Sequence, residues 1–396
     1  MRDGWIETTL DGIAEVVMGQ SPDGKTYNQE GKGLPFMQGS AEFGEHNPVP
    51  EKWCSDPKKI AEPGDLLLSV RAPVGDTNFA DQRIAVGRGL SIIRANKESL
   101  TEFIRLVIQL NVVELLASSG SGMFASITGK NLKEFKVNLP PLPEQKRIVD
   151  LIASVDSYIE ALQQQLESAK RSRNAVLHEL LTAGSDDWVE TTLGEICADG
   201  LFADGDWVES KDQDPEGDYR LLQLADIGDG TFLNKSDRWM NREQFNRLGC
   251  TKLEVNDVLI ARMPDPIGRA CLFPEGLPVC ATVVDVAIVR TGNETLQKFL
   301  ALLINSSDFR TEAFSLLTGT TRQRISRGNL AKIFFVIPSQ EKQLAIVNLI
   351  SLFDGEISQS VRVIEEAKQL RSGLLSDLLS GEHEIPVTYD KVMGAA

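Results

Sequence analysis

Apolar residues recur alternately four and three positions apart in two long stretches of the chain. The first stretch covers positions 148–180 and the second covers 346–378, and each follows a segment that contains proline. This heptad spacing is typical of the seam of a coiled coil and predicts one long helix in each stretch. The predicted seam consists of Ile148, Ile152, Val155, Ile159, Leu162 and Leu166 in the first helix and of Ile346, Ile350, Phe353, Ile357 and Ile364 in the second.

An arginine interrupts both seams at the corresponding position, Arg173 in the first helix and Arg371 in the second. Its guanidinium group is expected either to extend into solvent or to pair with an acidic side chain across the seam. A lone helix with such an apolar stripe would be unstable in water, so we expect the two seams to pack against each other.

The direction of the pairing follows from the distance that the intervening chain must bridge. About 40 helical residues make a rod of roughly 60 Å. The segment between the helices begins at the end of the first and leads directly into the start of the second. A compact domain of about 150 residues has a radius of gyration of only about 15 Å, too small to connect points a full rod apart. The helices are therefore expected to be antiparallel.

The remaining patterns are shorter and mixed. Apolar runs at 65–70 and 258–261 are bounded by turn-forming residues and predict strands. Apolar residues at helical spacing over 98–118 and 294–317 predict helices. Each long helix is therefore expected to follow a globular domain that mixes strands and helices.

The two globular domains are copies of one unit. Trp5–Leu10 reads WIETTL and Trp188–Leu193 reads WVETTL, and such self-similarity indicates internal duplication. Further matched segments are Gly64–Gly75 with Asn256–Gly268 and Ile127–Leu132 with Ile325–Leu330.

Together these patterns predict an α+β fold: two similar mixed α/β domains joined by two long antiparallel coiled-coil helices in a pseudo-two-fold dumbbell. Proline before each long helix and glycine after it, at Gly184 and Gly381, set the expected helix limits. The predicted boundaries are 1–139 for the first domain, 140–184 for the first spacer helix, 185–336 for the second domain, 337–382 for the second spacer helix and 383–396 for a C-terminal tail.

Composition narrows the class of protein. The formal net charge of −16 argues against autonomous binding to nucleic acid, because phosphate contacts come from lysine and arginine. The five cysteines lack C-x-x-C spacing and only three histidines accompany them, so we expect no metal site and no disulfide framework. No stretch is apolar enough for a membrane span and no signal sequence is evident, which favours a cytoplasmic protein without a membrane partner.

The sequence contains no recognisable catalytic motif. Thr128-Gly129-Lys130 lacks both the earlier glycine and the following serine or threonine of a Walker A loop. No Gly-x-Ser-x-Gly element occurs, and the three histidines are far apart in the chain. We therefore expect no catalytic residues and no enzymatic activity on this chain.

Several segments together resemble the specificity subunit of type I restriction-modification enzymes. Pro140–Val149 reads PPLPEQKRIV and leads into the first long helix, and the matched tryptophan-initiated segments, Gly64–Leu67 and Val86–Leu90 stand in the family's order. The resemblance covers essentially the whole chain. The second copy departs from it, because Ile337–Gln343 lacks the double proline and no counterpart of Gly87-Arg88-Gly89 occurs there.

The resemblance implies two target-recognition domains, each reading one part of a bipartite sequence in double-stranded DNA, with the helix pair as a spacer. It also implies two methyltransferase subunits docked on this chain and two ATP-dependent restriction and translocation subunits. No cofactor is implied on this chain, since S-adenosylmethionine and ATP would bind to the partners. Two related but non-identical domains further predict an asymmetric, interrupted target.

Candidate DNA contacts are polar or basic residues in loops, because these side chains supply groove hydrogen bonds and phosphate contacts. In the first domain they are Gln20, Ser21, Tyr27, Asn28, Gln38, Arg71, Arg88 and Lys130. In the second domain they are Gln223, Arg262, Arg269, Arg322, Arg324 and Arg327, of which the last three form a cluster. Given the acidic charge, we expect the isolated chain to bind DNA weakly and with steep salt dependence.

Two other functions compete with DNA recognition. The first is a non-enzymatic coiled-coil scaffold that spaces two protein-binding domains, and the arginines and glutamines at matched places in both copies argue against it. The second is an acidic DNA mimic, which would need rows of carboxylates with few arginines. The 41 lysines and arginines spread through the chain argue against a mimic.

Overall fold

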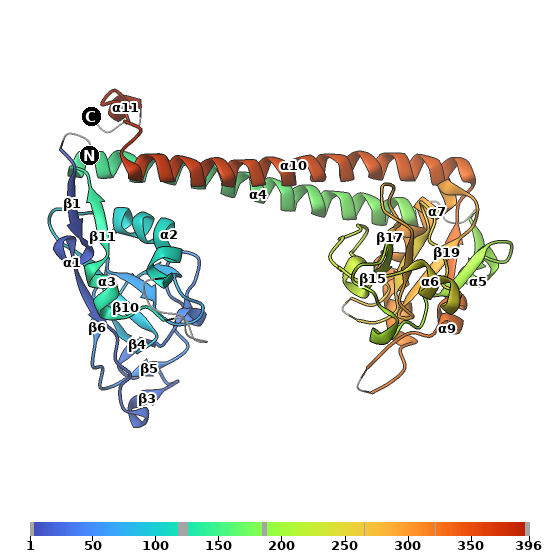
Figure 1. Ribbon diagram of the computed structural model, residues 1–396, viewed down its shortest axis with the longest axis horizontal. Coiled ribbons are helices and arrows are strands. Elements are labelled where there is room, and N and C mark those ends of the chain that lie inside the picture. Colours follow the sequence, from blue (N-terminus) through green and yellow to red (C-terminus); the bar gives the residue numbers. More distant parts are fainter. Residues whose placement is uncertain (1–3, 118–125, 184–187, 265, 321, 393–396) are drawn as a thin grey trace. The chain divides into compact units, whose positions relative to one another are not determined.

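The computed structural model describes residues 4–117, 126–183, 188–264, 266–320 and 322–392 (Figure 1). The chain divides into two compact units, the first made of Met1–Gln164 with Val361–Ala396 and the second of Gln165–Ser360. Each unit therefore contains one globular domain and a part of each of two long helices. Gly184, the predicted end of the first helix, lies outside the described residues.

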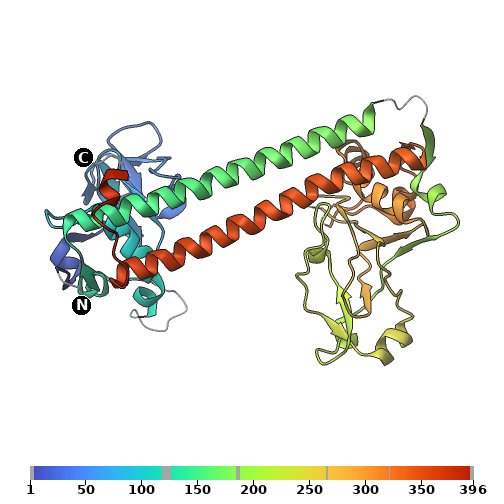
Figure 2. The same ribbon diagram turned by 90° about the horizontal axis from the view of Figure 1, so that it is seen from above.

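The two long helices predicted from the heptad pattern are present. Helix α4 spans Leu142–Thr182 and helix α10 spans Gln340–Ser380, with 41 residues each. Gly381 follows α10 with a φ of 78°, a left-handed conformation that favours glycine and ends the helix. Figure 2 shows α4 in green and α10 in red.

In the first unit the beginning of α4 packs against the end of α10. Ile148 and Ile152 are each 1% exposed and share a core with Leu378. Arg371 donates two hydrogen bonds to the carboxylate of Asp156, from Nε to Oδ1 at 2.5 Å and from Nη2 to Oδ2 at 2.8 Å. The helices are therefore antiparallel in this unit, as predicted.

The second unit repeats this arrangement with the other ends of the helices. Leu177 of α4 shares a core with Ile346 and Ile350 of α10. Arg173 donates to the carboxylate of Asp354, from Nε to Oδ1 at 2.6 Å and from Nη2 to Oδ2 at 3.2 Å. Both seam arginines thus pair with an acid across the seam instead of extending into solvent. Every residue of the predicted seam is buried or half-buried.

The first domain contains two sheets and a short terminal ribbon. The antiparallel sheet has the order β2 (Ala14–Met18), β10 (Leu90–Ala95), β7 (Leu66–Ser69) and β8 (Thr77–Phe79). The mixed sheet has the order β3 (Tyr27–Asn28), β5 (Trp53–Cys54), β4 (Leu34–Met37), β9 (Ile84–Val86) and β6 (Ile60–Ala61). The ribbon pairs β1 (Ile6–Thr9) with β11 (Lys136–Leu139), and the helices are α1 (Leu10–Ile13), α2 (Thr101–Ala117) and α3 (Gly129–Glu134).

The second domain has the same plan, as expected of a duplication. Its antiparallel sheet has the order β13 (Leu201–Asp204), β19 (Val286–Arg290), β16 (Val258–Ala261) and β17 (Ala270–Leu272). A second sheet has the order β15 (Trp239–Met240), β14 (Tyr219–Leu222) and β18 (Cys280–Thr282), and β12 (Val189–Thr192) pairs with β20 (Phe334–Ile337). The helices are α5 (Leu193–Ile196), α6 (Arg242–Leu248), α7 (Glu294–Ile304), α8 (Ser307–Ser315) and α9 (Arg327–Ala331).

A buried aspartate anchors the turn before the central strand in each copy. Asp65 precedes β7, and its carboxylate accepts hydrogen bonds from Arg94 at 3.0 and 2.7 Å. Asp257 precedes β16 and accepts from Arg290 at 2.7 and 2.6 Å. The residue before each aspartate has a positive φ, 89° at Gly64 and 69° at Asn256, which only glycine and asparagine adopt readily.

The single helix predicted over 294–317 is two helices. Helix α7 ends at Ile304. The side chain of the next residue, Asn305, accepts a hydrogen bond from Ala270 N and donates to the carbonyl oxygens of Ala270 and of Ala301, the latter at 2.7 Å. The hydroxyl of Ser306 then accepts a hydrogen bond from Phe309 N at 3.3 Å and caps α8. The apolar spacing continues through this break, so periodicity alone did not reveal it.

The C-terminal segment of the described chain returns to the first unit. Ile385 is 5% exposed in the core that also contains Ile148 and Ile152. Helix α11 (Tyr389–Val392) follows, and Arg147 Nη1 lies 3.3 Å from Oδ2 of Asp390. The segment predicted as a tail therefore contributes Ile385 to the folded core of this unit, with Tyr389 packed against it.

Candidate nucleic-acid interface

In each copy the loop after the first strand of the antiparallel sheet, β2 or β13, begins with a glycine that has no room for a side chain. Gly19 N donates to Leu90 O at 2.9 Å after β2, and Gly205 N donates to Val286 O at 2.8 Å after β13. A Cβ added at Gly19 would lie 2.1 Å from Gly87 O, and one at Gly205 would lie 2.2 Å from a backbone carbonyl oxygen. Only glycine fits, so the next two residues occupy matched positions: Gln20 and Ser21 in the first copy, Asp206 and Trp207 in the second.

Three of the DNA-contact candidates of the first domain line one hollow of about 450 Å³. These are Gln38, Arg71 and Arg88, all with exposed side chains, and Lys52 joins them. Ser21 lies beside the hollow, because its hydroxyl is 3.5 Å from the backbone nitrogen of Arg88. Glu42 is the one carboxylate in its lining, so the three basic side chains leave the surface net positive. We name this cationic surface, with Gln38, Lys52, Arg71 and Arg88, the first reading hollow.

The other candidates of the first domain lie outside this hollow. The hydroxyl of Tyr27 donates to Pro22 O at 3.0 Å, and burial raises the pKa of Tyr27. The side chain of Asn28 accepts hydrogen bonds from the backbone nitrogens of Glu30 and Lys32 at 3.1 and 2.9 Å and shapes its own loop. Gln20 is exposed, and Lys130 lines a separate hollow with Lys133.

The second domain has a hollow of about 640 Å³, and the loop after β13 lines part of it. Its walls carry Trp207, Gln223 and three carboxylates, those of Asp206, Glu209 and Asp285. Gln223 is the counterpart of Gln38, since each directly follows the matched strand, β14 or β4. We name this surface the second reading hollow. Its charge is opposite to that of the first reading hollow.

Trp207 is a candidate that the sequence patterns did not reveal. Its side chain is 70% exposed, which is unusual for the residue type. Aligning the two copies at Gly19 and Gly205 would have revealed it, because Trp207 then occupies the position of Ser21, already a candidate.

Arg262 is not a DNA contact, which corrects the prediction. It is 4% exposed, pairs with the carboxylate of Asp204 and donates to Ile325 O at 3.0 Å. Burial lowers its pKa. The error came from an alignment of the two copies that was shifted by one residue. The backbone nitrogen of Ile325 donates to Arg262 O, and in the first copy the matched Ile127 donates to Val70 O. Arg262 is therefore the counterpart of buried Val70 and not of Arg71.

Arg269 also holds the fold together, and its engaged guanidinium group disfavours the predicted DNA contact. Its guanidinium donates to the carbonyl oxygens of Ile227 at 2.7 Å, Leu224 at 3.1 Å and Pro266 at 3.1 Å. Five N–H donors are available on a guanidinium, and these carbonyls occupy most of them. Arg269 therefore connects two loops of the second domain.

The arginine cluster Arg322, Arg324 and Arg327 is exposed and remains a candidate for phosphate contact. Arg324 Nη1 lies 3.5 Å from Oδ1 of Asp285, so the cluster borders the second reading hollow. Arg327 donates to Phe202 O at 3.2 Å, and its guanidinium stays beside strand β13.

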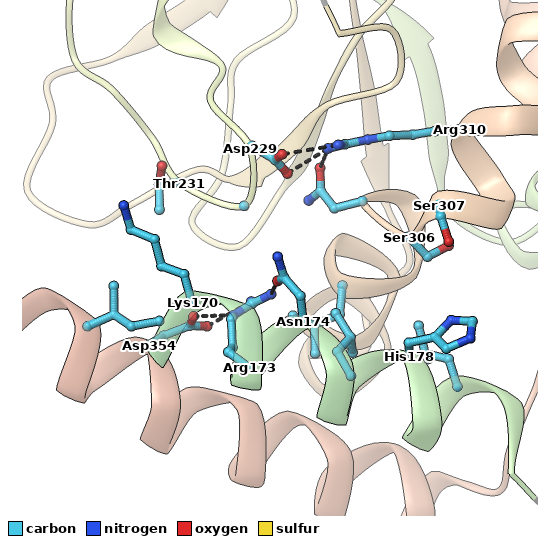
Figure 3. A pocket seen from close by; sticks show the side chains of 16 residues that line it. Lys170, Arg173, Asn174, His178, Asp229, Thr231, Ser306, Ser307, Arg310 and Asp354 are labelled. Atoms are coloured by element: carbon cyan, nitrogen blue, oxygen red, sulfur yellow. Dashed lines mark hydrogen bonds and ion pairs between the residues drawn. The ribbon is translucent and has the colours of Figure 1, made fainter. Parts of the chain in front are cut away.

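A further hollow of about 590 Å³ lies in the second unit, where α4 and α10 meet the second domain (Figure 3). Arg310 donates to both carboxylate oxygens of Asp229, at 3.0 and 2.6 Å, on the domain side. Arg173 and Asp354 pair on the helix side, with Lys170 and His178 nearby on α4 (Figure 3). Both guanidinium groups are paired with carboxylates, so this hollow is polar but largely charge-balanced.

Neither a membrane span nor a metal cluster is found in the part of the chain that the structure describes. No helix there is long and apolar enough to cross a bilayer. No three side chains of histidine, cysteine, aspartate or glutamate lie close enough together there to hold a metal ion. All five cysteines are buried and free.

The chain resembles proteins of one family over both copies. The family model described as type I restriction modification DNA specificity domain matches residues 2–171 and 185–369. A Methanocaldococcus jannaschii protein, provisionally named the MjaX type I restriction enzyme specificity subunit, is 39% identical over 178 residues, which are 45% of this chain and 42% of that protein. The chain thus spans less than half the length of this relative.

A second relative matches over nearly the whole chain. The EcoBI type I restriction enzyme specificity subunit of Escherichia coli is 21% identical over 419 residues, covering 96% of this chain and 87% of that protein. A chain from a solved structure that concerns assembly and conformational transition of the type I R-M system has the same fold, with a TM-score of 0.66, 18% identity and coverage of 96% and 98%. Because the family model matches both copies, the chain belongs to the family of type I restriction-modification specificity subunits.

Proposed function

We propose that this chain recognises an asymmetric, interrupted sequence in double-stranded DNA and contributes no catalytic step of its own. The observation that carries the proposal is a pair of reading hollows at matched places in the two copies. Each is built on the loop after a sheet strand and contains a glutamine, Gln38 or Gln223. Loop residues presented by a rigid sheet are a frequent way to build a binding site.

The two reading hollows favour unlike half-sites. Arg71, Arg88 and Lys52 present donors that suit the acceptor atoms of guanine in the major groove. The second hollow presents carboxylates and an indole, which do not suit guanine. Identical copies would read a symmetric target, whereas these copies support an asymmetric one.

We further propose that two methyltransferase subunits dock on the long helices. In the second unit α10 exposes Leu344 by 48%, Leu349 by 39% and Leu352 by 73%, on one side of the helix. In the first unit the helices expose Leu370 by 71% and Tyr158 by 58%. Exposed apolar side chains of this kind mark protein interaction surfaces.

The remaining tasks of the complex fall to the partners. S-adenosylmethionine would bind to the methyltransferase subunits, and ATP to two restriction and translocation subunits. The net charge of −16 makes tight binding of phosphates by this chain alone unfavourable. The partners would therefore supply the basic surface that holds the duplex, and the hollow beside Arg310 and Arg173 is a polar surface against which one of them could pack.

Selection from a random duplex library tests the proposal. The chain, purified with its methyltransferase partner, is expected to enrich one motif made of two unlike blocks separated by unspecified bases. The chain alone should enrich it far less at physiological salt. Enrichment of a continuous palindrome, or of no motif by an active complex, would contradict the proposal.

A further inference from the structure

Trp207 is exposed, although the matched tryptophans that begin the two copies are buried. Trp5 is 5% exposed and Trp188 is 9% exposed, while Trp207 is 70% exposed. An indole carries a large apolar surface, and leaving it in water is unfavourable unless a partner covers it.

Hydrogen bonds of the preceding residue hold the loop that carries Trp207. On the preceding residue, Asp206 N donates to Thr282 O at 2.7 Å and the Asp206 carboxylate accepts from Thr251 N at 3.0 Å. The indole nitrogen of Trp207 lies 3.4 Å from the carboxylate of Glu209. The ring is therefore presented on an ordered loop, which lowers the entropy cost of binding.

The surroundings of Trp207 limit which base pair fits. Asp206, Glu209 and Asp285 line the same hollow, and carboxylates accept hydrogen bonds from base amino groups. In the major groove, adenine and cytosine both present an amino group that carboxylates can accept from, so the carboxylates alone do not separate A·T from G·C. Only an A·T pair adds the thymine methyl group, the one apolar feature of that groove. The exposed indole is therefore the feature that favours an A·T pair.

The arginine cluster supplies the charge that a duplex requires at this place. Arg324 borders the hollow through its contact with Asp285, and Arg322 and Arg327 are exposed on the same segment. The matched positions of the first copy carry no arginine, since Arg324 corresponds to Ser126 and Arg327 to Gly129. This segment of the second copy therefore carries three arginines where the first copy has only Lys130.

We propose that Trp207 is a specificity-determining residue that contacts the 5-methyl group of a thymine in the half-site read by the second domain. The proposal rests on the proposed function and adds the base and the group that is read. The first domain has Ser21 at the corresponding position and makes no such contact.

Replacement of thymine by deoxyuridine tests this directly, because deoxyuridine pairs normally and lacks only the methyl group. Each thymine of the selected target is replaced in turn, and binding to the chain with its methyltransferase partner is measured. One replacement in the second half-site should weaken binding about fourfold, the effect of one buried methyl group. In Trp207→Ser, which introduces the first copy's residue, binding should be at least about tenfold weaker and that deoxyuridine effect should vanish.

Two controls separate the outcomes. Trp207→Phe keeps an aromatic surface and should retain most of the deoxyuridine effect, and thermal unfolding should show that neither variant is less stable. Two results would overturn the proposal, provided that the complex binds its target. In the first, deoxyuridine weakens binding equally with Ser or Trp at position 207. In the second, deoxyuridine has no effect at any thymine of the second half-site. Failure of the unaltered complex to prefer any sequence would instead overturn the proposed function.

Discussion

Burial decides which arginines of the second domain can reach DNA. Arg262 and Arg269 have guanidinium groups directed at backbone carbonyls, whereas Arg322, Arg324 and Arg327 are exposed. Residue type and loop position could be predicted from the sequence for all five. Their environments could not be predicted, because the matched segments differ in length by one residue. The sequence alone therefore did not decide whether Arg262 aligns with buried Val70 or with exposed Arg71.

Substitution of these arginines should therefore give two different results. Arg322→Ala with Arg327→Ala is expected to weaken DNA binding by the complex to a similar extent for all sequences and to reduce the salt slope of log K by about one for each lost phosphate contact. Arg262→Ala leaves Asp204 without its buried partner and should instead lower the free energy of unfolding by about 2 kcal/mol. Salt titrations and urea unfolding measure the two effects. A loss of salt slope in Arg262→Ala with unchanged stability would contradict this assignment.

The buried cysteines make the stability of the chain depend on pH. Burial raises the pKa of Cys197 and Cys280 to about 11 and of Cys271 to about 12. In the unfolded chain a thiol loses its proton at about pH 8.5. The native state therefore keeps protons that the unfolded state loses, and the free energy of unfolding should fall as pH rises from about 8.5 to about 11.

Thiol chemistry checks the same point. At about pH 8 the native chain should react slowly with a disulfide reagent, because the thiolate is the reactive form. Addition of urea should make all five thiols reactive. Rapid labelling of Cys271 in the folded chain would contradict its buried, protonated state.

At the scale of elements, helix periodicity was the strongest sequence signal. The heptad pattern predicted α4 and α10 because an apolar spacing repeated over many turns is specific to long paired helices. The break at Asn305 and Ser306 depends on local side-chain hydrogen bonds to Ala270 and Phe309, which periodicity does not contain. The strands beside the reading hollows were too short to give a periodic signal at all.

The paired arginines explain how the helices keep one alignment. A heptad seam packs almost equally well if one helix moves by seven residues, so apolar residues alone do not select the alignment. One heptad to either side of Asp354 lie Val347 and Val361, neither of which can pair with Arg173. The pairs Arg173–Asp354 and Arg371–Asp156 therefore favour the observed alignment in their respective units.

Charge exchange tests this role. Arg173→Asp should lower stability by about 1–2 kcal/mol, because two carboxylates then face each other at a half-buried site. Adding Asp354→Arg should restore most of the loss, as measured by urea unfolding of the full chain. If the free energy of unfolding of the double variant equals the value expected from adding the two single effects, the pair has no specific role.

The exposed leucines of α10 carry a separate prediction. Leu352→Asp should leave the stability of the chain unchanged, since the side chain is 73% exposed, and should weaken methyltransferase binding at least about tenfold. The matched control is Ser358→Asp, which adds the same charge at an exposed position of the same helix, about 120° around the axis from Leu352. Equal binding by both variants in co-purification or calorimetry would place the docking surface elsewhere.

At the scale of the whole molecule, duplication supplies two domains of one fold and divergence gives them different surfaces. The first reading hollow is cationic and the second contains carboxylates and Trp207, although both contain the matched glutamine. Sequence comparison of the copies predicted the shared fold. The divergence in surface chemistry became visible only when Arg88, Trp207 and Asp285 could be placed around the matched glutamines.

Methylome sequencing of a host that carries this chain with its methyltransferase partner tests the central claim most directly. We predict one interrupted motif with two unlike halves, in which Arg71→Ala with Arg88→Ala relaxes one half while Trp207→Ser relaxes the other. A palindromic or uninterrupted motif would contradict this prediction. A result in which both sets of substitutions relax the same half of the motif would also contradict it.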